Sequence, residues 1–483
     1  MIKIEVNNIN SKIVGNIDNT IIYDLYAAMT YKTSEFNGFN FVTIDHVLYN
    51  RQKQSFPTGL FSKAADVLET HKIDYDVIDN RLKPATNKPL KLHAKLRPYQ
   101  TDIVEAAIDH QRFVIQVATG GGKTVIAGAI LAKLNMPSIF VVHTGDLFEQ
   151  AYDDLTQLLQ IPIGKIGGGE CDIKKINVCM VQTIHAVLGK EYVPFDEVEK
   201  EQMENDTIVK KSYLRNDSIK RFLQTVQCIM VDECHHLSAN SYVETMKVCK
   251  SSYFRGGLSA TPETGTGRDM VLQAYAGSIV AQVSASYLIE HEYLVRPKIY
   301  YLQGSKNAAY KFSRKKYKTI YKLYIVNNTY RNQLIVDCVK RLHGLNKSIL
   351  ITVTTKNHGH LLLKMIRAID GISCEFIYSH VDKMLRKKYI DQVRNKQLDV
   401  ILGTSLADEG LNIPALDSLI LAGGGKSPTR VIQRIGRTLR LSDGKTEAIV
   451  IDFKDNLRYL IGHYKKRRAI CEQERQFQLI DSF

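Results

Sequence analysis

The stretch Val117-Ala118-Thr119-Gly120-Gly121-Gly122-Lys123-Thr124 decides the fold of this chain. It follows an apolar run, Phe113 to Val117, and precedes a helical pattern from Val125 to Leu134. A strand that turns through glycines into a helix is typical of a phosphate-binding loop, because glycine lets the backbone wrap an anion and the helix start offers free N–H groups. In this interpretation Lys123 reaches the β- and γ-phosphates of a nucleotide, and the Thr124 hydroxyl binds Mg²⁺.

The loop departs in one place from the usual G-x-x-x-x-G-K-[ST] spacing, which has a glycine where this chain has Val117. Taken alone, the stretch also fits a glycine-rich turn followed by a chance Lys-Thr pair. A partner motif with acidic residues is needed to decide between the two interpretations.

Length and charge bound the class of protein. A chain of 483 residues is too long for one ordinary core and predicts two or three domains. Its formal net charge of +15 favours a polyanionic partner, most often nucleic acid, although a merely basic protein has the same charge. The eight cysteines contain no C-x-x-C pair, so neither a zinc knuckle nor a redox pair is expected. With no signal-peptide pattern and no apolar run of about 18 residues, we expect a soluble intracellular protein without membrane contact, in whatever cell hosts it.

Residues 1–90 predict a small N-terminal α/β domain. Their apolar patterns predict two strands and two helices, at 2–6, 41–49, 21–31 and 60–71. The Lys and Arg residues between 51 and 95 fit a solvated surface and a grip on a nucleic-acid backbone equally well. The segment 84–89 is the expected linker.

A glutamine lies just upstream of the phosphate loop, in Leu96-Arg97-Pro98-Tyr99-Gln100. In that position the Gln100 amide can read the N6/N7 edge of an adenine, and Arg97 can stack on the base. Without the loop, the segment is an ordinary helix start.

A second motif supplies the acidic partner. Beyond residue 139 strand and helix patterns alternate, which predicts a doubly wound parallel sheet with ligands at the carboxyl ends of its strands. One strand, Cys228 to Val231, ends in Asp232 and Glu233. Asp232 can hold Mg²⁺ through water and Glu233 can polarise an attacking water, and an acidic helix cap is the weaker alternative. The adjacent Cys234-His235-His236 cannot converge on one tetrahedral ion, so we interpret His235 as a coupling residue and expect no metal there.

The rest of the chain predicts a second unit of the same kind. Residues 191–220 are expected to form a surface excursion, and Gly256 to Pro262 a turn after a short strand. The segment 306–331, rich in Lys and Arg with interleaved Tyr, fits either a nucleic-acid track or a helix with its Tyr side chains packed inward. Five buried strands are predicted, at 348–352, 374–378, 399–402, 418–422 and 448–453.

Arginines recur every third residue near the end of this unit, at Arg434, Arg437 and Arg440, so a helix would place them on one face. A planar, permanent charge of this kind can stabilise a γ-phosphate during hydrolysis. A solvated basic helix, or one resting on nucleic acid, is the alternative.

The ordered motifs from about 94 to 455 resemble those of the superfamily 2 helicases, above all the XPB-like branch that includes phage UvsW-type enzymes. The resemblance implies two RecA-like doubly wound parallel-sheet domains behind a small α+β N-terminal domain. The implied boundaries are 1–90, 91–297, 298–455 and, for a basic helical tail, 456–483. ATP and Mg²⁺ are the implied cofactors.

By the same resemblance, the residues take the roles of the helicase motifs. Adenine would contact Arg97 and Gln100, and the rest of the nucleotide would contact Gly120, Gly121, Gly122, Lys123, Thr124 and Gly410. Mg²⁺ would be held by Thr124 and Asp232. Catalysis would rest on Lys123, Glu233, Gln433, Arg437 and Arg440, and coupling on His235, Ser259 and Thr261. Nucleic-acid backbone would contact Thr144, Gln182, Thr183, Thr354 and Thr404.

The chain departs from the family pattern in two places. Asn412 stands where many relatives have an aspartate, which leaves one nucleotide contact without its charge. Cys234 stands where a small residue is common, which is sterically tolerable.

The resemblance implies an ATP-dependent DNA helicase or translocase that acts on branched or forked DNA in replication, recombination or repair. Each lobe would hold part of the nucleotide chemistry, so that ATP binding and hydrolysis close and open the lobes along a strand. An RNA helicase, and a duplex-DNA translocase subunit that does not unwind, stay open as alternatives. Intact Lys123 and Glu233 disfavour a scaffold with a dead ATPase.

Overall fold

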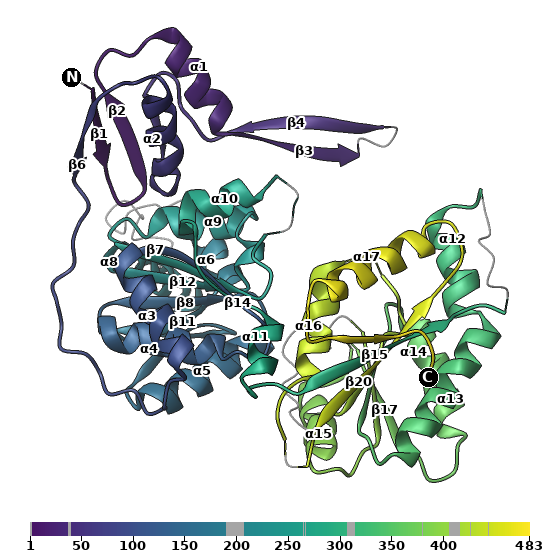
Figure 1. The fold of residues 1–483 in the computed structure, drawn as a ribbon. Coiled ribbons are helices and arrows are strands. Elements are labelled where there is room, and N and C mark those ends of the chain that lie inside the picture. Colours follow the sequence, from purple (N-terminus) through teal and green to yellow (C-terminus); the bar gives the residue numbers. More distant parts are fainter. Residues whose placement is uncertain are drawn as a thin grey trace. The chain divides into compact units, whose positions relative to one another are not determined.

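The computed structural model describes residues 2–36, 40–189, 207–263, 265, 267–306, 314–378, 380–404, 416–425, 427–442 and 444–483. The chain divides into two compact units, Met1–Val117 with Gly122–Gln282 and Ala118–Gly121 with Val283–Phe483. Each unit contains a large sheet of mostly parallel strands with helices on its faces (Figure 1). The predicted α/β class is therefore confirmed.

The large sheet of the first unit has the order β10-β9-β11-β8-β12-β13-β7-β14. Its strands are β7 (Arg112–Val117), β8 (Ser138–Val142), β9 (Ile163–Gly167), β10 (Glu170–Asp172), β11 (Ile176–Met180), β12 (Cys228–Asp232), β13 (Phe254–Ser259) and β14 (Ile279–Val283). Strands β8 and β13 are buried along their whole length, as expected for parallel strands covered on both faces. The covering helices are α3 (Pro98–His110), α4 (Lys123–Leu134), α5 (Gly145–Leu159), α6 (Val181–Leu188), α8 (Thr207–Thr225), α9 (Asn240–Val248) and α10 (Asp269–Ala276).

The register of this sheet brings five strand ends to one edge. Val142 of β8 lies beside Met180 of β11. Asp232, at the end of β12, lies beside Leu258, and Ser259 at the end of β13 lies beside Gln116 of β7. Side chains that follow these strands are therefore neighbours although they are far apart in the sequence.

The expected excursion at 191–220 is wrong for its second half. Residues 207–220 belong to α8, because Ile219 and Leu223 are fully buried and anchor a helix on the sheet. Residues 190–206 lie outside the described residues.

The N-terminal module has a four-stranded sheet of order β5-β2-β1-β6 and a separate hairpin, β3–β4, which extends away from that sheet in Figure 1. Of the predicted elements, the strand at 2–6, the strand that starts at Phe41 and the helix that ends near His71 are confirmed, whereas the first helix ends at Ala28 and not at Tyr31. The elements are β1 (Ile2–Val6), β2 (Asn10–Val14), α1 (Asn19–Ala28), β3 (Thr30–Phe36), β4 (Phe41–Val47), β5 (Ser55–Pro57), η1 (Thr58–Leu60), α2 (Phe61–Thr70) and β6 (Tyr75–Asp79).

This module packs against the rest of the first unit through contacts with the backbone of that unit. The Asn8 side chain donates a hydrogen bond to the Lys250 carbonyl (3.2 Å) and accepts one from the Leu82 amide (3.0 Å). Gly59 lies against α10 so closely that an added Cβ would be 2.1 Å from the Gln273 carbonyl oxygen. The apolar core runs continuously from Ile4 of the module to Ile139 of the large sheet.

We predict that Gly59→Ala loosens the module from α10. The new methyl group would overlap two backbone carbonyl oxygens that cannot rotate away, at a cost of about 1–3 kcal/mol in the free energy of unfolding. Thermal denaturation and hydrogen exchange of the α10 amides measure the effect. Gly145→Ala, at a position where an added Cβ meets nothing within 4 Å, is the control. Equal stability of the two variants would contradict the tight contact.

The large sheet of the second unit has the order β17-β18-β16-β19-β20-β15-β21. The five predicted strands are confirmed as β16 (Ile349–Thr352), β17 (Cys374–Ile377), β18 (Val400–Gly403), β19 (Ser418–Ile420) and β20 (Glu447–Lys454). The sequence patterns missed β15 (Arg296–Gln303) and β21 (Gln478–Ile480). Because β21 pairs with β15, residues 456–483 close the sheet edge and are not a purely helical tail.

The helices of the second unit cover both faces of this sheet (Figure 1). They are α11 (Ala285–Glu290), α12 (Tyr317–Tyr321), the π-helix η4 (Lys322–Val326), α13 (Thr329–Gly344), α14 (Lys356–Arg367), α15 (Lys383–Arg394), α16 (Pro428–Thr438) and α17 (Leu460–Glu472). In the part of the chain that the structure describes, no helix is long and apolar enough to cross a membrane.

Candidate functional site

The phosphate loop has the backbone that its glycines predict. Strand β7 ends at Val117 and α4 begins at Lys123. Between them Gly120 and Gly122 have φ angles of +89° and +82°, which only glycine adopts without strain. Val117 is fully buried as the last residue of the strand, so the position that departs from the usual spacing belongs to the core and not to the loop.

Five predicted residues converge beside the loop. The Lys123 ammonium lies 3.3 Å from Glu233 Oε1. The Ser259 hydroxyl donates a hydrogen bond to Glu233 Oε2 (3.2 Å) and lies 3.2 Å from His235 Nδ1. The Thr261 amide donates to the same hydroxyl oxygen (3.1 Å), so the turn after β13 is tied to the carboxylate that ends β12.

The two adjacent carboxyl groups titrate differently. Burial, reinforced by the charge of Glu233, raises the pKa of Asp232 to about 6. Burial also opposes the charge of Glu233, but the Lys123 ammonium and His235 hold the pKa of Glu233 below its usual value. Glu233 is therefore an anion at neutral pH, and Asp232 is a carboxylate that gains from a cation.

The residues fit a bound Mg²⁺. A carboxylate and a hydroxyl are the hard oxygen donors that this ion takes. Asp232 ends β12, Thr124 is the second residue of α4, and burial beside the charge of Glu233 raises the pKa of Asp232. Asp232 and Thr124 would hold the ion together with nucleotide phosphates.

Gln100 is 4% exposed and caps its own helix. Its side-chain oxygen accepts a hydrogen bond from the Arg97 amide (2.9 Å), and its Nε2 would lie 2.6 Å from a Cβ added at Gly122. The structure thus places the Gln100 amide over the phosphate loop. Adenine recognition by Gln100 and Arg97 stays a prediction.

The predicted nucleic-acid contacts of the first unit follow β8 and β11. Thr144 caps α5, where its hydroxyl oxygen accepts a hydrogen bond from the Leu147 amide (3.3 Å). Gln182 is exposed at the start of α6, next to Thr183, and donates to the His143 carbonyl oxygen (2.7 Å). The Thr144 and Gln182 loops are therefore joined to each other.

Sequence reasoning missed two histidines between these loops and the nucleotide site. The ring of His236 lies 4.1 Å from that of His235 and 4.5 Å from that of His143. These three rings link the surroundings of Glu233 with the Thr144 loop. The adjacent histidines 235 and 236 were the available signal, but their link to His143 depends on the strand register.

The arginines of the second unit do not share one helix face. Helix α16 ends at Thr438, so Arg440 lies beyond it, and the one-face prediction is wrong for this residue. Gln433 and Arg434 are buried, at 9% and 6% exposed, whereas Arg437 and Arg440 are partly exposed. Thr354 is exposed and Thr404 is 9% exposed, after the neighbouring strands β16 and β18. Gly410 and Asn412 lie outside the described residues.

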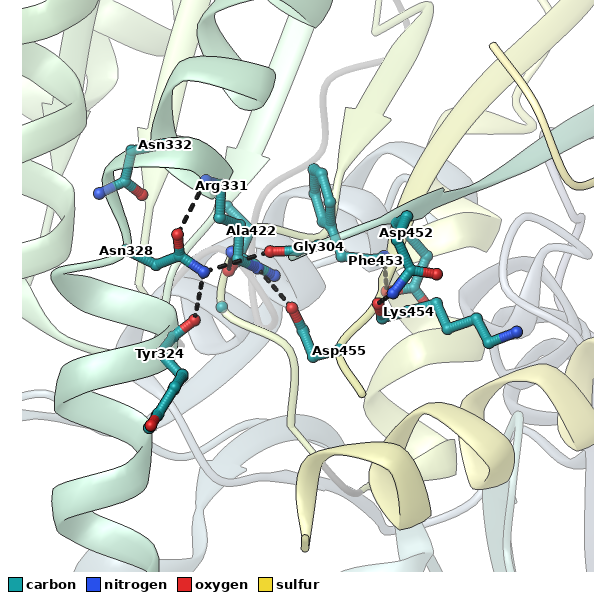
Figure 2. A network of polar contacts seen from close by, with 12 residues as sticks. Gly304, Tyr324, Asn328, Arg331, Asn332, Ala422, Asp452, Phe453, Lys454 and Asp455 are labelled. Carbon is teal, nitrogen blue, oxygen red and sulfur yellow. Dashed lines mark hydrogen bonds and ion pairs between the residues drawn. The ribbon is translucent and has the colours of Figure 1, made fainter. Parts of the chain in front are cut away.

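A polar network holds the turn that leads from β19 towards α16. Arg331 is fully buried, and its Nε donates a hydrogen bond to Asp455 Oδ1 (3.1 Å) (Figure 2). Arg331 also donates to the Ala422 carbonyl oxygen (2.7 Å). Arg467 pairs with Asp452 and donates to the Gly425 carbonyl oxygen (2.9 Å). Two buried guanidinium groups thus fix the backbone on either side of Gly423.

Comparisons with known proteins agree with this architecture. Residues 93–264 match the family described as type III restriction enzyme, res subunit, and residues 331–442 match the helicase conserved C-terminal domain. The DNA 3'-5' translocase XPB2 of Sulfurisphaera tokodaii is 24% identical over 82% of this chain and 89% of its own. The ATP-dependent DNA helicase uvsW of Enterobacteria phage T4 is 25% identical over 74% of this chain and 68% of its own.

The likeness extends to solved structures. Saccharomyces cerevisiae Dbp5 bound to RNA and ADP BeF3 aligns with 80% of this chain and 90% of its own, with a TM-score of 0.54 and 15% identity. Such an alignment shows the shared fold, two RecA-like domains in one chain. With family matches over both large sheets, the chain belongs to the superfamily 2 helicases, in the XPB-like and UvsW-like branch, and it is an ATP-hydrolysing enzyme.

Proposed function

We propose that this protein is a DNA helicase or translocase that uses ATP to act on branched or forked DNA in replication, recombination or repair. The observation that carries the proposal is the cluster of Lys123, Glu233, His235 and Ser259, which joins a nucleotide site to the turn after β13. Predicted strand contacts, Thr144 and Gln182, follow the ends of neighbouring strands at the same sheet edge.

The residues of the first unit divide the chemistry of hydrolysis. Lys123 offers a positive charge to the phosphates and now neutralises Glu233. Glu233, an anion at neutral pH, is suited to accept a proton from the attacking water. Bound Mg²⁺ would neutralise developing phosphate charge. Ser259 contacts both Glu233 and His235, so a change at the carboxylate reaches the turn at Thr261.

DNA is favoured over RNA as the substrate by the relatives. XPB2 is described as a DNA translocase and uvsW as a DNA helicase, and both align with most of this chain. The net charge of +15 suits either nucleic acid. An RNA helicase, or a duplex translocase that does not separate strands, is the second candidate.

The deciding experiment compares ATPase stimulation by single-stranded, duplex, forked and four-way DNA and by RNA, together with strand displacement on a fork. We expect the strongest stimulation with forked or four-way DNA, and displaced strands. If only RNA stimulates the ATPase, the substrate is RNA and the protein is an RNA helicase. Stimulation by duplex DNA without displaced strands would favour the translocase subunit.

We predict that Lys123→Ala lowers ATP turnover by at least about a hundredfold, because the phosphates lose their main positive charge. DNA binding, measured by fluorescence anisotropy without nucleotide, is expected to stay nearly unchanged. The matched control is Lys133→Ala on the same helix, since Lys133 is exposed and pairs with Glu105. Retained turnover in Lys123→Ala would show that the loop does not bind phosphates.

We predict that Arg437→Ala still binds ATP but hydrolyses it about a thousandfold more slowly, because a guanidinium that stabilises transition-state charge acts on turnover and not on ground-state binding. Arg437 belongs to α16 in the second unit, whereas Lys123 and Glu233 belong to the first. Equilibrium binding of a fluorescent nucleotide and single-turnover hydrolysis separate the two effects. A proportional loss of both would assign Arg437 a structural role.

A further inference from the structure

We propose that the second unit carries a base-stacking site for single-stranded nucleic acid, which we call the tyrosine patch. It consists of Tyr317 and Tyr459 with the basic residues Lys315, Lys316, Lys318, Lys322 and Arg458. The two tyrosines are 39% and 38% exposed. The proposal deepens the proposed function, on which it rests, by naming an unpaired strand as the ligand.

The rings of the patch are partly exposed and pack edge to face. Tyr317 lies edge-on to Tyr459, with ring centroids 6.1 Å apart and planes at 83°. Tyr317 also lies 5.3 Å from His463, and the Arg458 guanidinium lies 5.0 Å above the Tyr459 ring. Partly exposed rings with a cation nearby provide the π-faces and the charge that stack an unpaired base and hold its phosphate.

Tyr459 is held in this place by an unfavourable backbone. Its φ angle is +70°, in the region where glycine or asparagine is comfortable and a bulky side chain is rare. The residue immediately precedes α17, so a glycine there would relieve the strain without changing the helix. Strain that is kept on an exposed aromatic side chain points to a use for that side chain.

A second irregular element supports the other side of the patch. Helix α12 continues into the π-helix Lys322–Val326. Such wide turns are rare in proteins, and those that occur are often at functional sites. Ile320, Ile325 and Val326 are buried and pack in one small core with Leu457 and Leu460. This core holds the α12 and η4 helices against the start of α17. The sequence left open whether the tyrosines of this region pack inward or face a ligand, and the structure shows both, because Tyr321 is buried while Tyr317 and Tyr324 are partly exposed.

The charge around the rings selects the ligand. Residues 314–331 contain no Asp or Glu, and the basic side chains at 315, 316, 318 and 322 are all exposed. A polyanion with flat aromatic rings satisfies both features. In a duplex the base faces are stacked on one another and are not available, so the rings select an unpaired segment.

The patch also adjoins a predicted backbone contact. The Tyr321 hydroxyl and the Thr354 hydroxyl both donate hydrogen bonds to the Gly423 carbonyl oxygen, at 2.8 and 3.3 Å. Tyr317 lies next, with its ring centroid 6.0 Å from that of Tyr321. Thr354 and the ring of Tyr317 are thus connected through the buried Tyr321, so a strand that contacts Thr354 lies on the same part of the second unit as the patch.

The test measures binding of a short oligo-dT that carries one 2-aminopurine, whose fluorescence falls when the base stacks on a tyrosine. We expect Tyr459→Ala to weaken binding of the single strand about tenfold and to restore much of the fluorescence, whereas Tyr459→Phe keeps both properties. Affinity for a blunt duplex of the same length is expected to stay unchanged. Tyr23→Ala, at a tyrosine of the N-terminal module that is 63% exposed, is the control for loss of an exposed ring.

Thermal denaturation confirms that each variant is folded, and Tyr317→Ala repeats the test from the other segment. Unchanged single-strand binding in both tyrosine variants would overturn the site. Equal losses for single strand and duplex would overturn stacking, because charge alone explains them. Binding of poly-glutamate that is lost in Tyr459→Ala would make the ligand an acidic protein. None of these binding measurements uses ATP, so they test the patch independently of the ATPase assay. If DNA fails to stimulate the ATPase, that result contradicts the proposed function and leaves the test of the patch unaffected.

Discussion

Two adjacent carboxyl groups at the end of one buried strand, Asp232 and Glu233, set the constraint on which the rest of this protein depends. Neighbouring carboxylates repel each other, and burial makes each charge more costly. In the structure the Lys123 ammonium forms an ion pair with Glu233, and the pKa of Asp232 is raised to about 6. A nucleotide with its metal would supply the missing positive charge to Asp232 and compete for Lys123. A nucleotide bound there would therefore change the charge balance of the two carboxyl groups, and Ser259 links Glu233 to the turn after β13.

The packing beneath the pair explains why the residue after it is small. Cys234 is fully buried, and a Cβ added at Gly257 would lie 2.6 Å from the Cys234 Cβ. A larger side chain at 257 would therefore push the turn that carries Glu233 and His235. The same strand needs a second glycine, because a Cβ at Gly256 would lie 2.1 Å from the Phe113 ring of β7. The two consecutive glycines of β13 thus let this strand lie close to Phe113 of β7 and to the turn that contains Cys234.

Local patterns predicted the parts of this protein that depend on local physics. The phosphate loop, the acidic pair and helix α5 at Gly145–Leu159 follow from glycine conformation, strand ends and apolar periodicity. The residues that sequence reasoning missed depend on distant partners. Arg331 can be buried because it pairs with Asp455 and donates a hydrogen bond to the Ala422 carbonyl oxygen. His143 contacts His236 only because of the register of β8 and β12. Arg440 was misplaced because α16 ends at Thr438, although the arginine spacing continues past that end.

The turn at Gly423 connects the surroundings of the proposed tyrosine patch with a predicted strand contact. Its carbonyl oxygen accepts hydrogen bonds from Tyr321, beside the tyrosine patch, and from Thr354, a predicted strand contact. On one side, the Ala422 carbonyl oxygen is held by the buried Arg331, which pairs with Asp455 (Figure 2). On the other side, the Gly425 carbonyl oxygen is held by the buried Arg467, which pairs with Asp452. Removing one member of such a buried pair leaves an uncompensated charge, so the arginines form a rigid base. On that base, the Gly423 carbonyl holds the Tyr321 and Thr354 hydroxyls to one firmly supported turn, and this turn precedes α16, the helix that carries Arg437.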